Sequence, residues 1–514
     1  MPDAAHSTPP ASPDAPARRR LRGRWIDAWA PEDERFWETT GKRIARRNLI
    51  LSIFAEHLGF NVWVLWTIVV INLGNIGIGL SLAESFWLTA VPNLIGAGLR
   101  VPYTFAIGRL GGRAWTAISA GLLLIPCLLV ATIVPSGWLA DQSHGTQFWV
   151  LLACAATAGF GGGNFSSSMT NISFFYPEGK KGLPLGLNAA GGNIGVAVSQ
   201  LVLPLVIIIG VPAAAVAQPI HEVHLANAGL VWMPLIVIAV LGALLRMDSL
   251  AQARNDAGSY KLALREPQTW IMSILYIGTF GSFIGMAFSL PLVIRNTFPE
   301  FLADHPFIAA YLAGLGFTGA LVGSLSRPLG GWLSDRIGGA KVTLWCFVAM
   351  AAFTLVAIVG VSERSFALFF GSFMVLFAFI GMANGSTYRM IPSIFAALGR
   401  REAGEKGLPA EQTAVEFKRR AAAALGIIGA IGAFGGFLVQ LVLRQASLGV
   451  SAAVSAAETP ADKLAVAIAH SDWSIPALWA FIAAYVVLAG MTWFFYLRTS
   501  VATQRVPSFA YANV

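Results

Sequence analysis

Apolar segments long enough to cross a lipid bilayer recur along the whole of this 514-residue chain. A helix of about 20 mostly apolar residues spans the hydrocarbon core of a membrane. Hydrophobic residues make up 56% of the chain and charged residues only 12%. We therefore predict an all-α polytopic membrane protein with twelve spans, near 48–73, 86–108, 114–134, 148–176, 183–210, 228–247, 269–294, 306–330, 341–360, 366–396, 421–445 and 474–497.

The distribution of basic residues between the loops predicts the orientation of the chain. Positively charged flanks of membrane helices are retained in the cytoplasm. With the amino terminus inside, 28 of the 35 Lys and Arg residues fall on cytoplasmic segments and four on outer loops. We expect both termini in the cytoplasm and a location in the cell inner membrane. The net charge of +9 then reflects topology and does not indicate nucleic-acid binding.

The predicted spans divide the chain into two halves with flanking segments. We expect six-helix bundles at 48–247 and 269–497, a cytoplasmic linker at 248–268 and a cytoplasmic tail at 498–514. Residues 1–47 are expected to form a cytoplasmic tail, without the apolar core of a cleavable signal peptide, and an amphipathic lead-in. The aromatic residues of this lead-in are expected at the membrane surface; they are Trp25, Trp29, Phe36 and Trp37.

The cysteines and histidines show no pattern typical of a disulfide, a metal site or a catalytic site. Cys127, Cys154 and Cys346 all lie in apolar spans and are predicted to be packing residues. Six of the seven histidines lie outside the spans. We expect a protein that is not an enzyme, binds no metal or cofactor, and is a monomer without an obligate protein partner.

Two glycine-rich tracts 240 positions apart are copies of each other. Residues 186–203 read GLNAAGGNIGVAVSQLVL, and residues 426–443 read GIIGAIGAFGGFLVQLVL. Glycines at three- and four-residue spacing remove the side chains from one helix face, so that another helix or a small ligand can approach the backbone. The chain is thus predicted to consist of two related halves, each with one such helix.

A second pair of similar segments aligns the halves independently. The sequence GWLSDRIGGAK at 331–341 resembles the G-x-x-x-D-R-x-G loop of the major facilitator superfamily and contains Asp335 and Arg336. Its counterpart after the second span retains Arg109, but Gly108 replaces the aspartate. Eight residues before Asp335 and Gly108 lie Arg327 and Arg100, which are therefore equivalent. Eight residues of helix rise about 12 Å, so both arginines are expected at the same depth in the membrane.

Two arginines within membrane spans carry a free-energy cost, which a function must justify. An arginine in the middle of a membrane helix costs roughly 2.5 to 3.5 kcal/mol, even on the lenient insertion scale. Glu56 is the only acidic residue within a predicted span, so a purely structural pair of salt bridges is not available. We expect Arg100 and Arg327 to form an anion site between the halves. The planar guanidinium group suits flat oxyanions, which leaves nitrate, nitrite, bicarbonate, formate and small carboxylates open.

Polar residues in three spans are candidates to line this site. Span four and span ten share Asn164 with Asn384 and Ser166 with Ser386 at equivalent positions. Such side chains more often bond a backbone carbonyl group or a neighbouring helix than a ligand. Asn193 is the better candidate because it belongs to the first glycine-rich tract.

Together these features resemble the nitrate/nitrite porter family of the major facilitator superfamily, in particular its bacterial NarK type. The resemblance rests on the two glycine-rich tracts, GGGNFSSSMTNISFFYP in span four, LRVPY around Arg100, and the lead-in WAPEDERFW, and it runs from Trp25 to about Arg498. It implies the superfamily fold, with twelve helices in two pseudo-symmetric six-helix bundles. It also implies a nitrate or nitrite ion between the arginines, with substrate-binding residues at Phe165, Phe280, Tyr276, Asn193, Gly192, Gly426 and Gly429. Departures from the family pattern are Gly429, where relatives have serine, and Arg389, where they have glutamine.

Two transport mechanisms remain open from the sequence. One nitrate neutralises only half the charge of two arginines, so the empty site is expected to reorient poorly, which favours nitrate/nitrite antiport. The alternative is nitrate/proton symport, for which Glu56 is the candidate proton carrier, with His57 beside it. Both residues are expected near the cytoplasmic start of the first span, where snorkelling would also satisfy them. An anion channel or a sensor on the same scaffold is a more remote alternative.

Overall fold

The computed structural model describes residues 19–20, 25–216, 221–253, 257–499, 509–510 and 514. Within them the chain is almost entirely helical, and the predicted all-α class is confirmed. The first half comprises β1 Arg19–Arg20, β2 Trp25–Ile26, α1 Glu34–Phe36, η1 Trp37–Gly41, α2 Lys42–Val64, α3 Trp66–Asn72, η2 Leu73–Ile76, α4 Leu82–Leu110, α5 Gly112–Leu122, α6 Leu124–Thr132, α7 Gly137–Ala140, α8 His144–Phe175, η3 Glu178–Lys180, α9 Gly182–Ile207, α10 Ala213–Val216, α11 Ala226–Leu230, α12 Met233–Arg246 and β3 Ser249–Leu250.

The second half begins with a short helix that precedes the seventh predicted span. Its elements are α13 Ala257–Arg265, α14 Pro267–Tyr276, η4 Ile277–Gly281, α15 Ser282–Thr297, α16 Pro299–Asp304, α17 Pro306–Tyr311, η5 Ala313–Leu315, α18 Phe317–Ile337, α19 Gly339–Ser362, α20 Phe366–Lys406, α21 Ala410–Ala456, α22 Pro460–Ala469, α23 Ile475–Thr492 and η6 Trp493–Leu497.

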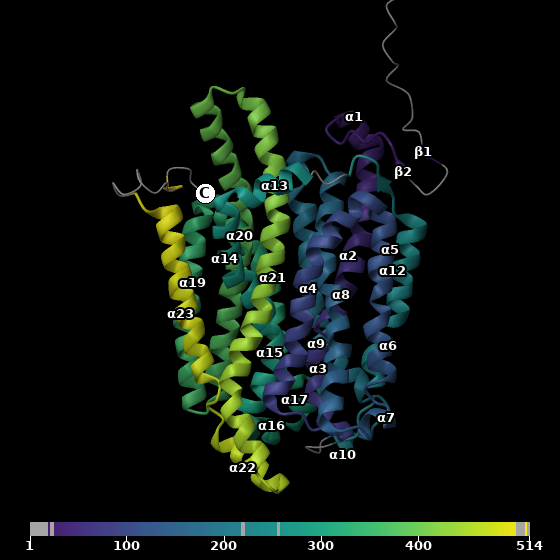
Figure 1. Ribbon diagram of the computed structural model, residues 1–514, viewed down its shortest axis with the longest axis vertical. Helices are drawn as coiled ribbons and strands as arrows, with labels where there is room; N and C mark the ends of the chain where they lie inside the picture. The colour runs from purple at the N-terminus through teal and green to yellow at the C-terminus, as the bar shows by residue number, and fades with distance from the viewer. Residues whose placement is uncertain (1–18, 21–24, 217–220, 254–256, 500–508, 511–513) are drawn as a thin grey trace, which may run out of the picture.

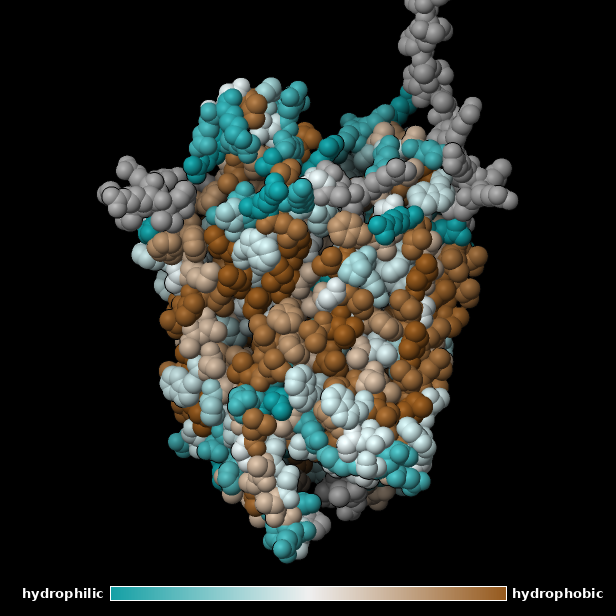
Figure 2. Space-filling model, in the orientation of Figure 1, coloured by the Kyte–Doolittle hydropathy of each residue, from teal (hydrophilic) through white to brown (hydrophobic). Residues whose placement is uncertain are grey.

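A membrane-spanning zone is evident in the helices and on the surface. In the described part of the chain, ten helical segments are long and apolar enough to cross a bilayer. The other two predicted spans correspond to α4 and α18, the helices that carry Arg100 and Arg327. Figure 2 shows a broad hydrophobic zone at mid-height between two hydrophilic ends. The sequence placed the start of span eight too early, because Gly314 has a positive φ of 65° and separates η5 from the long helix α18.

The two halves stand side by side, with their long helices roughly parallel (Figure 1). We call the end that carries the lead-in and α13 the α13 end, and the opposite end, with α7, α10, α16 and α22, the α16 end. Between the halves, α4 packs against α21, and α18 packs against α9. Each arginine-bearing helix therefore packs against the glycine-rich helix of the other half.

The lead-in differs from the expectation of an aromatic segment at the membrane surface. Trp29 and Trp37 are buried at the α13 end of the first half, where Trp29 packs edge-on against Phe175 and Trp37 packs against Tyr176. Strand β2 pairs antiparallel with β1 and parallel with β3, which follows α12. The rings are buried because they cover the end of α8. The predicted tail at 1–18 and 21–24 lies outside the described residues.

The segment between the tenth and eleventh predicted spans is helical. Helix α20 continues to Lys406 and α21 starts at Ala410, so that the two form a hairpin that projects beyond the other helices in Figure 1. Arg420 of α21 joins the two arms by an ion pair to Glu402 of α20, and it also pairs with Glu416 of its own helix. The three cysteines are buried and free, as predicted for packing residues.

Candidate functional site

Helix α4 holds Arg100 in a completely buried position between the two halves. Its Nε donates to the carbonyl oxygen of Gly162 in α8 at 3.2 Å, and its Nη1 donates to the carbonyl oxygen of Gly429 in α21 at 2.8 Å. The third nitrogen, Nη2, is buried and has no hydrogen-bond partner among the described residues. Arg100 thus spans the interface and keeps one donor group free.

Arg327 of α18 is also buried, with 8% of its surface exposed. Its Nη2 donates to the hydroxyl oxygen of Tyr276 at 3.5 Å, and its guanidinium carbon lies 5.5 Å from the ring centroid of Tyr388. Its Nη1 is buried without a hydrogen-bond partner among the described residues. Neither Arg327 nor Arg100 forms a salt bridge with a described acidic side chain. The two guanidinium groups nevertheless lie near enough to each other to interact electrostatically.

Stacked aromatic rings connect the two arginines. The ring centroids of Phe165 and Phe280 are 6.1 Å apart, and those of Phe280 and Tyr276 are 5.4 Å apart at an interplanar angle of 11°. The guanidinium carbon of Arg100 lies 4.8 Å from the centroid of Phe165 and 4.9 Å from that of Phe280. Cation–π contacts of this kind stabilise a desolvated guanidinium group without neutralising it.

Tyr276 precedes an irregular turn in its helix, and Phe280 lies within that turn. Residues Ile277–Gly281 form η4, a π-helical turn, between α14 and α15. Such turns inside α-helices are often found at functional sites, because the extra residue reorients the neighbouring side chains. A Cβ atom at Gly281 would lie 2.6 Å from the Cα of Gly435, so this close contact with α21 requires glycine.

The glycine-rich tracts receive large side chains from the first membrane span of each half, Glu56 of α2 and Tyr276 of α14. A Cβ atom at Gly192 would lie 2.6 Å from Oε1 of Glu56, and one at Gly432 would lie 2.3 Å from Cδ1 of Tyr276. At Gly429 the nearest atom would be Nη1 of Arg100, at 4.0 Å. Asn193 is buried, and its Oδ1 has no hydrogen-bond partner among the described residues. The structure thus places Gly429 beside Arg100 but Gly192 beside Glu56.

Glu56 is completely buried, so the snorkelling that the sequence left open does not occur in this structure. The helical segment that contains it begins well before it, with α1 at Glu34. Its Oε2 accepts hydrogen bonds from Ser168 and, at 2.7 Å, from Asn188. Its Oε1 has no partner among the described residues. The carboxyl group interacts electrostatically with both Arg100 and Arg327, so the three groups form one cluster of charge.

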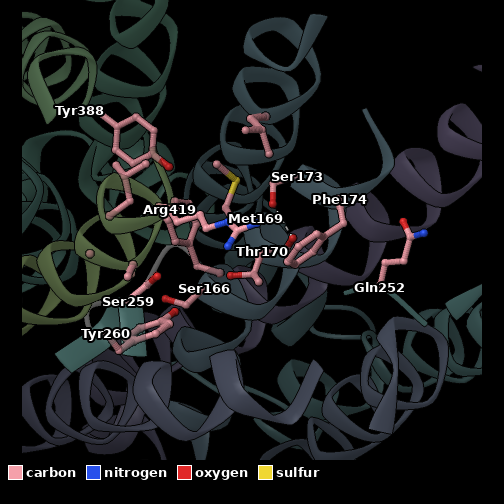
Figure 3. Close-up of a pocket in the computed structure, with 17 residues that line it drawn as sticks. Ser166, Met169, Thr170, Ser173, Phe174, Gln252, Ser259, Tyr260, Tyr388 and Arg419 are labelled. Atoms are coloured by element: carbon pink, nitrogen blue, oxygen red, sulfur yellow. Dashed lines mark hydrogen bonds between the residues drawn. The ribbon is translucent and has the colours of Figure 1, made fainter. Parts of the chain in front are cut away.

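A cavity of about 430 Å³, lined by residues of both halves, lies on the α13 side of this cluster (Figure 3). Phe165, Tyr388 and Gly429 lie at its inner end, while Tyr260 of α13 and Arg419 of α21 line it nearer the surface. Gly426 also lines it, and a Cβ atom there would lie 3.2 Å from the Tyr260 hydroxyl oxygen. The cavity therefore reaches, from the α13 end, residues that contact the arginines, although neither Arg100 nor Arg327 lines it.

At the α16 end the halves are joined by hydrogen bonds from the two equivalent glutamines of the tracts. Gln200 of α9 donates through Nε2 to the carbonyl oxygen of Ala287 in α15, at 2.8 Å. Gln440 of α21 accepts through Oε1 from the hydroxyl group of Thr89 in α4, at 2.9 Å. Eleven residues separate Gln440 from Gly429, a rise of about 16 Å along the helix. Access from the α16 end is therefore closed in this conformation.

The loop motif forms an ion pair in one half only. Asp335 pairs with Arg389 of α20, and both side chains are about half exposed. Arg336 lies 4.0 Å from the ring centroid of Trp332, and Arg109 is exposed. In the first half Gly108 stands where the second half has Asp335, so the aspartate of this pair is missing there. The pair also accounts for Arg389, the departure from the family pattern noted in the sequence.

Several residues of the cluster were not predicted from the sequence. They are Trp63 and Gly162, which contact Arg100, Tyr388, which contacts Arg327, and Ser168 and Asn188, which bond Glu56. Tyr388 and Ser168 belong to the polar runs of spans ten and four, which were singled out for their Asn and Ser residues. Among the described residues, no group of His, Cys, Asp and Glu could hold a metal ion.

The chain resembles known transporters in both sequence and structure. Residues 49–440 match the model of the Major Facilitator Superfamily. The chain is 38% identical to the nitrate/nitrite transporter NarU of Escherichia coli (strain K12), over 80% of this chain and 87% of that protein. It is 36% identical to the probable nitrate/nitrite antiporter NarK2 of Thermus thermophilus, over 73% of this chain and 84% of that protein. The nitrite extrusion protein of Bacillus subtilis (strain 168) is 29% identical, over 78% of this chain and 87% of that protein.

Solved structures support the fold. A bacterial homolog of the human lysosomal transporter Spinster aligns with a TM-score of 0.60 at 15% identity, over 88% of this chain and 97% of that one. A D-xylose-proton symporter aligns with a TM-score of 0.60 at 14% identity, over the same shares. The predicted superfamily fold is confirmed, as is the prediction of a transporter rather than an enzyme. The chain belongs to the Major Facilitator Superfamily and, within it, to the NarK-type nitrate/nitrite porter family.

Proposed function

We propose that this protein exchanges nitrate and nitrite across the membrane by alternating access, with the anion held between Arg100 and Arg327. The names of its relatives support the substrate class. The observation that carries the proposal is the pair of buried arginines, each with one guanidinium nitrogen that no described residue satisfies. A buried charged donor without a partner is costly, and a bound oxyanion removes that cost.

The surroundings of the arginines suit a flat, monovalent anion. Phe165 and Phe280 present ring faces beside Arg100, and the Tyr276 hydroxyl group lies beside Arg327. A planar ion fits between ring faces and accepts hydrogen bonds in its own plane from the guanidinium forks. We place Asn193, Gly192, Gly426 and Gly429 in the wall of this site, as the family resemblance implies.

The charge of the cluster favours exchange. When Glu56 is ionised, the two arginines and this carboxylate carry a net charge of +1, and one nitrate or nitrite makes the cluster neutral. A neutral cluster passes through the closed intermediate at a lower desolvation cost than a charged one. The halves at 48–247 and 269–497 should therefore reorient readily with an anion bound and slowly without one, which is the behaviour of an antiporter.

Lysine substitutions test the arginine site. In proteoliposomes, Arg100→Lys and Arg327→Lys should each lower labelled nitrate transport by roughly ten-fold or more, because lysine retains the charge but loses the planar fork. The amount of protein incorporated into the vesicles and its melting temperature in detergent serve as controls for folding. Full transport in both variants would refute the proposed site.

Nitrate/proton symport is the second candidate, and the burial of Glu56 supports it. This carboxyl group has one oxygen without a described partner and lies within the electrostatic reach of both arginines. A proton on Glu56 would return the nitrate-loaded cluster from neutral to +1. Symport would require nitrate-driven acidification of the vesicle interior, which a pH-sensitive dye reports and which Glu56→Gln should abolish.

We place the protein in the cell inner membrane as a monomer, with both termini and the α13 end in the cytoplasm. The excess of basic residues on the segments at that end supports this orientation. The cavity of Figure 3 then opens toward the cytoplasm, and the closed α16 end faces outward.

A further inference from the structure

The outer part of the cavity contains an arginine that the central site does not use. Arg419 is an exposed residue of α21 and lines the cavity; Figure 3 shows its guanidinium group in the region of Met169 and Thr170 of α8. It forms no salt bridge with a described acidic residue, whereas its neighbour Arg420 pairs with Glu402 and Glu416. Ten residues separate Arg419 from Gly429, a rise of about 15 Å.

A row of hydroxyl groups lines the same cavity from the other half. Ser166, Thr170 and Ser173 of α8 all line it, and their spacing of four and three residues places them on one helix face. Tyr260 adds a phenolic hydroxyl group from α13. None of the described residues that line the cavity is an aspartate or a glutamate. Ser173 already donates its hydrogen to the carbonyl oxygen of Thr170, at 2.7 Å. The passage therefore offers a cation and the remaining neutral hydroxyl groups, and no carboxylate that would repel or displace an anion.

We propose that Arg419 and the α8 hydroxyl row form an outer anion site, which binds nitrate or nitrite briefly between the surrounding solution and the central arginines. The proposal rests on the proposed function and identifies a second position for the same substrate. A single exposed cation holds an anion weakly and raises its local concentration. Weak binding suits a passage, because an anion held tightly there would not move on to the central site.

The outer site should affect the capture of substrate and not its translocation. Arg419→Gln should raise the KM for transport from the α13 side by roughly two- to five-fold, the size expected for one exposed charge, and leave the maximal rate unchanged. The KM should also become less sensitive to ionic strength. Arg419→Lys should retain most of the wild-type KM, because attraction to the passage depends on charge.

The experiment measures nitrate transport in proteoliposomes of zwitterionic lipid. Two preparations are compared, which contain the protein in opposite orientations. Arg400→Gln is the matched control, since Arg400 is an exposed residue of α20 that does not line the cavity and its loss changes the net charge equally. The proposal predicts a raised KM on one side only, in Arg419→Gln and not in Arg400→Gln. An unchanged KM, an equal change in the control, or a change seen only when anionic lipid is added would overturn it. Absence of nitrate transport by the wild-type protein would instead refute the proposed function.

Discussion

At the scale of single residues, each membrane arginine is partly bound by the protein and partly free. Carbonyl oxygens of Gly162 and Gly429 hold two nitrogens of Arg100, and Tyr276 holds one of Arg327. These partners fix the direction of each guanidinium group without neutralising it, since none of them is charged. The remaining donors are therefore oriented before an anion arrives, which reduces the entropic cost of binding.

The glycines beside this site differ in how much space an added methyl group would have. Gly432→Ala should destabilise the protein by about 1–3 kcal/mol through overpacking, because its Cβ would lie 2.3 Å from the buried Tyr276 ring. The Gly429→Ala variant should have a melting temperature equal to or above that of the wild type, since the nearest atom to its Cβ would be 4.0 Å away. Melting curves in detergent compare the two variants. Equal melting temperatures for both would contradict the packing described for the second tract.

At the scale of helices, the two interfaces between the halves repeat each other. Helix α4 packs on α21 and α18 packs on α9, so each glycine-rich helix lies against an arginine helix of the opposite half. The cavity lies toward the α13 end of this arrangement, and the bonds of Gln200 and Gln440 lie toward the α16 end. Opening of the α16 end therefore requires both bonds to break.

Substitution of the two glutamines should shift the protein toward opening at the α16 end. Each buried hydrogen bond contributes about 0.5–1.5 kcal/mol, so the double variant Gln200→Leu/Gln440→Leu should shift the equilibrium on the order of ten-fold. Spin labels at the exposed positions Trp138 and Leu464, one in each half, report the distance across this end. A longer distance should become more populated in the double variant.

Gln147→Leu provides the control for this experiment. Gln147 is also buried and donates to the carbonyl oxygen of Leu139 at 3.2 Å, but both residues belong to the first half. Its loss should leave the distance distribution unchanged. An identical distribution in the double variant would show that the glutamines do not hold the α16 end closed.

The sequence predicted which segments are helical and which residues of the two halves are equivalent. It was less successful in predicting which face of a helix is buried. Apolar length identified the spans, and the repeat identified Arg100 and Arg327 as equivalent, because both properties depend on order along the chain. The burial of Glu56 was missed, since it depends on where the first helix begins and on which face meets α8 and α9. The burial of Trp29 was missed for the same reason: an amphipathic aromatic segment suits a membrane surface as well as a protein surface.

At the scale of the whole molecule, the charge of the cluster determines which states can move. Arg100, Arg327 and an ionised Glu56 carry +1 without substrate and zero with one monovalent anion. Reorientation of the two halves carries this cluster through a state closed at both ends, where water no longer screens it. Exchange of one anion for another follows if only the neutral, anion-loaded state passes readily. Net symport follows if the protonated, nitrate-loaded state and the empty, deprotonated state, which both carry +1, pass as well.

The most direct test is labelled nitrate uptake into proteoliposomes prepared with and without internal nitrite, with a pH-sensitive dye inside. Exchange predicts rapid uptake only into nitrite-loaded vesicles and no acidification that depends on nitrate. The opposite result, equal uptake into vesicles without nitrite accompanied by acidification, would contradict exchange through a site that must be occupied to reorient.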